Sequence, residues 1–156
     1  MAVVLAAFPA GANDCTAPPE PEVNWQRCYL DGRDLSRHDL SRARLIDASF
    51  QRADLADANL SGANAYRAKF ISATMGRSRL DDGVFREADF TKADLTGASL
   101  RNADLRRARF FRAILRGADL TGARTVGADL SNADLSGATW TDGKRVCAEG
   151  SSGQCN

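Results

Sequence analysis

Residues 88–122 read ADFTK ADLTG ASLRN ADLRR ARFFR AILRG ADLTG, a run of five-residue units without insertion or deletion. The same register extends from about Leu30 to Trp140, with a large and mostly apolar residue at every fifth position. A small residue lies two positions earlier, and between positions 43 and 138 it is alanine except at Ser78 and Gly83. A helix or a plain strand would need a different apolar spacing. The pattern predicts an inward-facing pair followed by a polar corner, so each unit forms one side of a coil.

Phenylalanine recurs in this register at intervals of twenty residues, which is four units. The residues are Phe50, Phe70, Phe90 and Phe110. A four-sided coil stacks these rings into one core column, whereas a three-sided coil scatters them over different faces. Offset stacking of aromatic rings adds favourable contacts beyond the burial of their area. The spacing therefore predicts a four-sided solenoid of about six coils.

The small residues have a steric reason, because a narrow four-sided interior has no room for two large side chains in one unit. The first units break this rule, since Cys28, Arg33 and His38 occupy the small position. We therefore expect the first coil to be splayed or partly open. Trp25 precedes the register and is expected to cover this end of the stack, with a partly exposed aromatic as the alternative.

Several units follow the pattern Ala-Asp-Leu-x-x, among them Ala93–Gly97, Ala118–Gly122 and Ala128–Asn132. In tandem, these units resemble the pentapeptide repeat family, and the resemblance covers about 110 residues. It implies an all-β fold, a right-handed quadrilateral β-helix. The chain ends resemble those of exported bacterial members, with Cys15, Trp25 and Cys28 before the repeats and Trp140–Cys155 after them.

We expect four segments along the chain. They are a signal-peptide remnant (1–12), an extended N-terminal cap (13–27), the pentapeptide-repeat β-helix (28–140) and a disulfide-closed C-terminal cap loop (141–156). Ala10 and Ala12 favour cleavage before Asn13 after a short apolar stretch. Because this stretch is short and no Lys or Arg precedes it, either the start codon is misplaced and the leader is truncated, or the segment is a flexible tail.

Four cysteines lie at the two ends of the repeat block, at Cys15, Cys28, Cys147 and Cys155. Four cysteines allow three connectivities. We favour the two local pairs, because a solenoid holds its ends far apart, and reduced thiols are the alternative. Disulfides favour a periplasmic or secreted protein over a cytoplasmic one.

Basic and acidic residues nearly balance, with 21 Lys and Arg against 20 Asp and Glu and a net charge of +1. This balance argues against a chain-wide DNA mimic and against a strongly basic, specific nucleic-acid binder. No apolar run has the length of a membrane span.

Catalytic chemistry has little support in the sequence. His38 is the single histidine, and no nucleophile or acid is arranged around it. Aspartates recur just before the large residue, as at Asp34, Asp54, Asp94 and Asp134, but this is the consensus position of the repeat. We expect these carboxylates to be solvated or bonded to backbone, and we predict no catalytic site, no cofactor and no metal.

Charges spaced by twenty residues alternate in sign along two rows, Asp47/Arg67/Glu87/Arg107 and Lys69/Asp89/Arg109/Asp129. Neighbours on successive coils should form a stabilising ladder. The excess of arginine, with nearby outward apolar residues, is a candidate docking face, against the alternative of ordinary scattered surface residues. This face comprises Tyr66, Ile71, Arg86, Arg101, Arg106, Arg107, Arg109, Phe111, Arg112 and Arg116.

These observations favour a non-enzymatic structural or protein-interaction module that presents a rigid face to an unknown protein partner. The alternative is a basic face that binds an anionic surface or polysaccharide. A DNA-mimicking topoisomerase-binding protein, as the family resemblance also implies, is less favoured because such a protein needs a strongly acidic surface.

Overall fold

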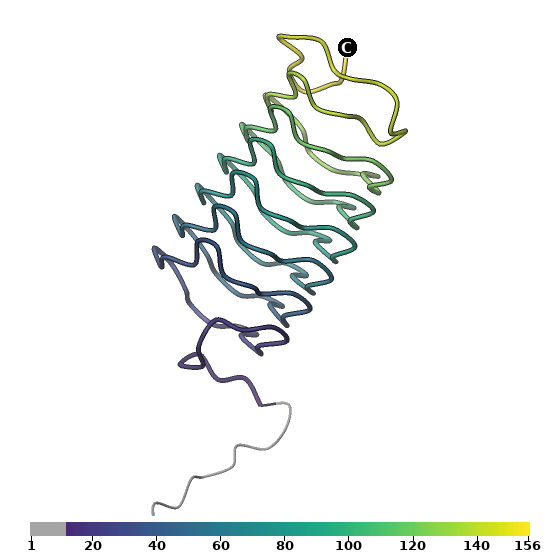
Figure 1. Cartoon of the computed structure of the whole chain (residues 1–156). Coiled ribbons are helices and arrows are strands. Elements are labelled where there is room, and N and C mark those ends of the chain that lie inside the picture. The colour runs from purple at the N-terminus through teal and green to yellow at the C-terminus, as the bar shows by residue number, and fades with distance from the viewer. Residues whose placement is uncertain (1–11) are drawn as a thin grey trace, which may run out of the picture.

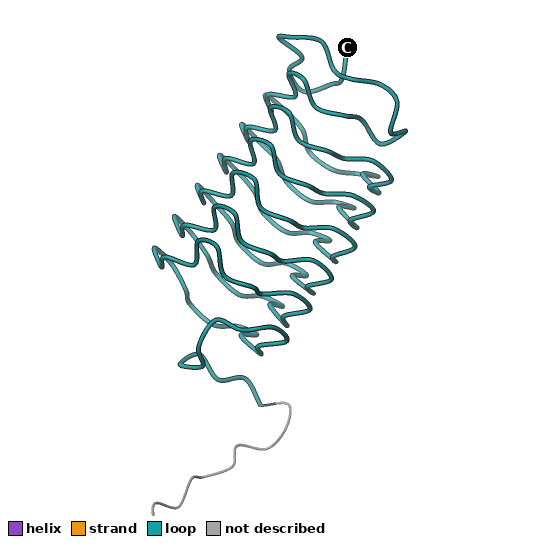
Figure 2. Ribbon diagram, in the orientation of Figure 1, coloured by secondary structure: helices purple, strands orange, loops and turns teal. Residues whose placement is uncertain are grey.

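The computed structural model describes residues 12–156 as a rod of stacked coils that ends in a C-terminal loop (Figure 1). The predicted signal-peptide remnant lies almost wholly outside these residues. Within the described part, turns alternate with single-residue β-bridges, so Figure 2 draws the whole of it as loop. No helix there is long and apolar enough to cross a membrane.

Each five-residue unit contains two turn residues and one bridging residue. Parallel bridges join residues twenty positions apart, from Asn24↔Arg44 to Asp119↔Thr139, and they recur every five residues. Each coil therefore has four sides, as the phenylalanine spacing predicts. On one side, the Leu30 N–H donates to the Ser49 carbonyl at 2.7 Å. The pairing repeats along the rod, so it fixes which side chains lie above one another.

The second turn residue of most units adopts a left-handed backbone conformation. Its φ is 55° at Arg77 and 58° at Arg107, although these residues are not glycine. Such a conformation costs a non-glycine residue about 1 kcal/mol. At the Arg107 corner, Asp104 accepts a hydrogen bond from the Arg106 N–H at 3.3 Å, and an Asp or Asn does the same at many other corners. These hydrogen bonds offset part of the cost.

The core consists of the large and small positions of the register. From Leu30 to Leu120 every large residue is at most 2% exposed. The predicted column exists as a stack of nearly parallel rings, whose centroids lie 5.1 Å apart for Phe50–Phe70, 5.0 Å for Phe70–Phe90 and 4.9 Å for Phe90–Phe110.

The first coil differs from the expectation of a splayed coil. Its backbone pairs with the second coil at Asn24, Tyr29, Asp34 and Asp39. Arg33 and His38 are exposed rather than inward-facing, because an end coil leaves such side chains a route to solvent. The register also begins one unit earlier than predicted. Trp25 is fully buried in a large position, and its ring centroid lies 6.5 Å from that of Phe50.

Disulfides join the local pairs favoured by the sequence, Cys15–Cys28 and Cys147–Cys155. The C-terminal tail, residues 141–156, folds back along two sides of the last coil. It forms antiparallel bridges between Thr139 and Val146 and between Asp134 and Ser152. Figure 1 shows this tail in yellow at one end of the rod, with the described N-terminal residues at the other.

Candidate interaction surface

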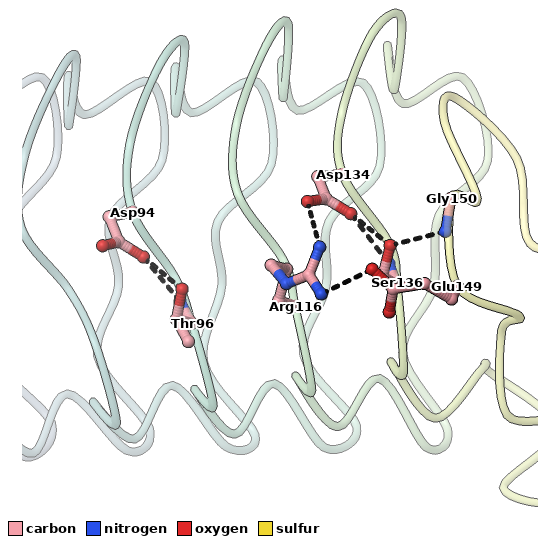
Figure 3. Close-up of polar contacts among 7 residues, drawn as sticks. All are labelled: Asp94, Thr96, Arg116, Asp134, Ser136, Glu149 and Gly150. Atoms are coloured by element: carbon pink, nitrogen blue, oxygen red, sulfur yellow. Dashed lines mark hydrogen bonds and ion pairs between the residues drawn. The ribbon is translucent and has the colours of Figure 1, made fainter.

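The recurring aspartates shape the corners of the coil. Asp94 accepts hydrogen bonds from the backbone N–H and the hydroxyl of Thr96, at 2.9 and 2.6 Å (Figure 3). Asp34 and Asp134 bind Ser36 and Ser136 in the same way. Side-chain and backbone hydrogen bonds from these serines lower the pKa of both carboxyls. These carboxylates thus have backbone and hydroxyl partners, which explains why the repeat places Asp before its large residue and Ser or Thr after it.

The bridges place every residue in one of four corner rows or on one of four flat sides. Corner I contains residues 46–47, 66–67, 86–87 and 106–107, and corner II contains 51–52, 71–72, 91–92 and 111–112. Corner III contains 116–117, and corner IV contains 101–102. We call the side between corners I and II, with both corners, the lateral face. On each coil it spans seven residues, in the ranges 26–32, 46–52, 66–72, 86–92, 106–112 and 126–132.

Most of the predicted docking residues lie on this lateral face. Corner I holds Tyr66, Arg86, Arg106 and Arg107; corner II holds Ile71, Phe111 and Arg112; and Arg109 lies on the flat side between them. Arg101 and Arg116 do not join them. They lie on corners IV and III, which border the opposite side of the coil. The sequence analysis grouped Arg101 and Arg116 with the others because they are close in sequence. The chain turns a corner every five residues, so residues that are close in sequence can lie on different sides of the coil.

Several arginines of the lateral face are in ion pairs between coils. Arg107 lies 3.9 Å from Glu87, Arg109 lies 3.1 Å from Asp89, and Arg67 lies 3.4 Å from Asp47 on the preceding coil. These are three of the six neighbouring pairs that the predicted charge ladder contains, so the ladder is confirmed in part. Exposed pairs of this kind contribute little individually, about 0–1 kcal/mol each.

Arg106 makes a bidentate ion pair with Asp104. Its guanidinium donates two hydrogen bonds to Asp104, at 2.8 and 2.6 Å, and Arg124 lies 3.5 Å from the same carboxylate. Asp104 is only 5% exposed. The hydrogen bonds from Arg106 lower the pKa of this carboxyl, against the opposing effect of burial. Arg106 is therefore held by the fold and contributes less freely to docking than the sequence suggests.

Other cations of the lateral face have no ion pair among the described residues. They are Arg27, Arg52, Lys69, Arg86, Lys92 and Arg112. The Arg112 guanidinium lies 5.1 Å from the ring centroid of Phe111, and Tyr66 donates a hydrogen bond to Glu87 at 3.3 Å. Lys69 belongs to the predicted ladder, but Asp89 pairs with Arg109 instead. Spacing alone leaves Asp89 two equivalent partners, one on each neighbouring coil.

The lateral face is therefore basic although the chain is nearly neutral. It contains ten Lys or Arg residues and five Asp or Glu residues, whereas the chain has 21 and 20. Of the local excess between Arg101 and Arg116, the four arginines on this face all lie on one coil, in the range 106–112, and the other six basic residues of the face come from earlier coils.

The two arginines away from this face stabilise the structure locally. Arg101 lies 2.9 Å from Asp119. Arg116 lies between Asp134, at 3.0 Å, and Glu149 of the tail, at 2.7 Å, as Figure 3 shows. Ser136 also accepts a hydrogen bond from the N–H of Gly150 at 3.0 Å. Arg116 thus fastens the C-terminal tail to the last coils.

His38 lies at the opposite end of the rod and is exposed. Its Nδ1 lies 3.0 Å from the Ser36 carbonyl oxygen. Among residues 12–156 no group of three His, Cys, Asp or Glu side chains could hold a metal ion.

The pentapeptide repeats family model matches residues 26–62, 48–86, 88–124 and 113–141, in eight copies. Among solved structures, the chain is similar to HetL, a pentapeptide repeat protein involved in heterocyst differentiation regulation from the cyanobacterium Nostoc sp. strain PCC 7120. The identity is 37% and the TM-score 0.77. The match covers 80% of this chain and 58% of HetL, so the chain spans less than two thirds of that relative.

Two further pentapeptide repeat proteins are similar in sequence. One, from the Arabidopsis thaliana thylakoid lumen, is 28% identical over 79% of this chain and 83% of its own, with a TM-score of 0.36. The other, Rfr23 from the cyanobacterium Cyanothece 51142, is 25% identical over 67% and 82%, with a TM-score of 0.38. These two superpositions are too weak to support an argument. No curated protein matches the sequence. The family and HetL imply a right-handed quadrilateral β-helix for this chain.

Proposed function

The chain belongs to the pentapeptide repeat family, and on that premise we propose that it is a non-enzymatic interaction module whose lateral face binds a protein partner outside the cytoplasm. Members of this family are generally non-catalytic repeat proteins. The observation that carries the proposal is the charge asymmetry of the rod, with ten basic and five acidic residues on one side of a nearly neutral chain.

A rigid scaffold is well suited to such a role. Backbone hydrogen bonds join every coil to the next, and about six four-sided coils would hold the docking side chains in fixed rows. A surface that is already ordered loses little conformational entropy on binding. Tyr66, Phe111 and Arg112 are the residue types enriched at protein interfaces.

The location is inferred from the cysteines. Both disulfides indicate an oxidising, non-cytoplasmic compartment, and we propose the periplasm or the exterior of the cell. There the Cys15–Cys28 bridge would fasten the N-terminal segment to the first coil, and the Cys147–Cys155 bridge would close the tail (141–156) at the other end.

Photo-crosslinking in the native host tests the face directly. A photoreactive amino acid replaces Tyr66 on the lateral face or, as a matched control, Arg79 on the opposite side of the coil. The proposal expects one discrete crosslinked protein from position 66 and none from position 79. Equal crosslinking from both positions, or none from position 66, would contradict it.

A second candidate function is binding of an anionic polysaccharide. It is favoured by the free cations of corner II, where Arg52, Lys92 and Arg112 lie in one row. Retention on immobilised dextran sulfate should then depend on salt. The triple variant R52A/K92A/R112A should elute at lower salt than R42A/R77A/R101A, which removes the same charge from ion-paired positions. Elution of the two variants at the same salt concentration would exclude corner II as the polysaccharide-binding site.

The same cations weigh against a DNA-mimicking, topoisomerase-binding role. Such mimicry requires a surface of fixed negative charge, and the ordered face of this rod is basic.

A further inference from the structure

The C-terminal end of the solenoid is covered over only half of its perimeter. The tail pairs with residues 133–140, which we call the covered half. There the N–H groups of Leu135, Gly137 and Trp140 donate to the carbonyls of Ser151, Cys147 and Arg145. Residues 123–132 form the two remaining sides of this end, and we call them the open half.

The open half has unused backbone groups. In inner coils the equivalent groups pair with the next coil, as where the Leu105 N–H donates to the Arg124 carbonyl at 2.9 Å. Within residues 12–156, no partner reaches the N–H groups of Thr125, Gly127 and Leu130 or the carbonyls of Ala123 and Ala128. They lie in the register that an additional strand would complete.

The apolar core is also incompletely covered here. Every large residue of the register from Leu30 to Leu120 is at most 2% exposed. On the open half Thr125 and Leu130 are partly exposed, and the adjacent Val126 is 77% exposed. The end therefore combines an unpaired strand edge with uncovered apolar side chains, the two features that strand addition uses for affinity.

The covered half shows which kind of segment this end accepts. The tail lies on it as an extended chain, with antiparallel bridges at Thr139↔Val146 and Asp134↔Ser152. The tail hairpin turns back at residues 141–144, before it reaches Ala123, and the tail approaches the open half only at its far edge, where Gly153 lies beside Leu130 and Asn132. An extended segment from another molecule can therefore continue the same layer.

Charges at this end select the partner. Lys144 and Arg145 are exposed and have no ion pair among the described residues, and Arg124 is paired only with Asp104 below it. Two acids at this end, Asp134 and Glu149, are paired with Arg116. The others are Asp129, which accepts a hydrogen bond from the Ser131 N–H, and Asp142, which accepts hydrogen bonds from the backbone N–H groups of Lys144 and Arg145. A second copy of this chain would bring like charges together, whereas an acidic strand would bring opposite charges together.

We propose that the open half is a strand-accepting site for an extended segment of another protein, in which acidic residues alternate with β-branched ones. The acidic side chains meet Arg124, Lys144 and Arg145, and the β-branched side chains cover Val126 and Leu130. This site lies at the end of the rod and goes beyond the lateral-face function.

The test uses an eight-residue peptide of alternating Glu and Val with blocked ends. Amide hydrogen exchange, resolved by NMR, reports on Thr125, Gly127 and Leu130. The proposal expects exchange at these three amides to slow by about tenfold or more when the peptide is added. A peptide N-methylated on the edge that would face the open half loses its N–H donors, and its methyl groups keep the two backbones apart, so it should give no protection. A Lys/Val version should protect much less.

Two exposed positions supply matched variants. Val126→Glu lies on the open half and should abolish protection by the Glu/Val peptide, whereas Tyr29→Glu, at an 86% exposed residue of the first coil, should leave it unchanged. Three results would overturn the proposal. The first is no protection of the three amides by the Glu/Val peptide, and the second is equal protection by the N-methylated peptide. The third is protection of these amides in concentrated protein without any peptide, together with a doubled mass by light scattering, which would make a second copy of this chain the occupant.

Discussion

The ring of Phe85 occupies the space that an alanine side chain would need at Gly83. A Cβ at position 83 would clash with the Cε2 atom of Phe85. On the preceding coil, the residue under Phe85 is Ala65 rather than leucine. The Phe85 ring lies tilted against Phe70 and Phe90, with centroids at 6.2 and 5.9 Å. The glycine at position 83, the phenylalanine at position 85 and the alanine at position 65 thus have one explanation, the space that the tilted Phe85 ring takes up in the core.

The first prediction concerns this packing. Gly83→Ala should destabilise the protein by about 1–3 kcal/mol, because the Phe85 ring must move within a filled core. The double variant G83A/F85L restores the consensus pair and should recover much of the loss. Urea unfolding monitored by circular dichroism measures both. Gly76→Ala is the control, because a Cβ there would meet only the Thr96 carbonyl at an ordinary 3.7 Å. An equal loss in both alanine variants would refute this packing explanation.

The second prediction concerns the phenylalanine column. Phe70 stacks on Phe50 and Phe90, whereas Phe110 stacks only on Phe90. Phe70→Ala should cost about 3–5 kcal/mol through the cavity that it leaves. Phe70→Leu should cost more than Phe110→Leu, because it removes two ring stacks rather than one. Similar urea midpoints for the two leucine variants would show that stacking adds nothing to burial here.

The third prediction concerns acid. Hydrogen bonds from Arg106 lower the pKa of Asp104 in the folded state. As the pH falls, the Asp104 carboxyl is therefore protonated in the unfolded chain, at a pKa of about 3.9, before it is protonated in the folded protein. The stabilisation is present above that pH and is lost as the pH falls through the lower pKa of the folded state. The urea midpoint should decrease from pH 5 to pH 2. The decrease should be smaller in Asp104→Asn, which should be less stable than the wild type at pH 7 by roughly 1–3 kcal/mol. Parallel pH profiles would exclude this pair as a contributor.

The fourth prediction concerns the tail. The Cys147–Cys155 bridge spans eight residues of sequence separation, and its removal should cost about 2–3 kcal/mol in the loop-closure account. In C147S/C155S the amides of Leu135, Gly137 and Trp140 should exchange faster, since their acceptors lie on the tail. Amides of central coils, such as Leu80, serve as the control. Unchanged exchange at the three amides would show that Arg116 and the backbone bridges hold the tail without the disulfide.

Much of the fold could be predicted because nearly every five-residue unit places one large and one small side chain at the same two inward positions. The spacing of Phe50 and Phe70 alone determines a four-sided coil, and the alanines fix which position faces inward. The end coils were harder to predict. Arg33 and His38 occupy an inward register position, but an end coil lets them turn to solvent.

The candidate face was predicted only in part, for an electrostatic reason. The register places Lys69 and Arg109 at equal spacing from Asp89, but it does not say which of the two pairs with it. Arg116 resembles its basic neighbours in sequence, but the tail residue Glu149 reaches it from 33 positions away. The repeat pattern of a single sequence does not specify which basic residue pairs with which acidic residue.

The central claim is that the chain works as a disulfide-closed rod outside the cytoplasm. The most direct measurement is the intact mass of the protein from its native host, expressed from its full upstream reading frame and alkylated with and without prior reduction. The account predicts a chain that begins at Asn13, with four cysteines alkylated only after reduction. An uncleaved chain with four cysteines alkylated without reductant would contradict it and would direct the search to partners inside the cell.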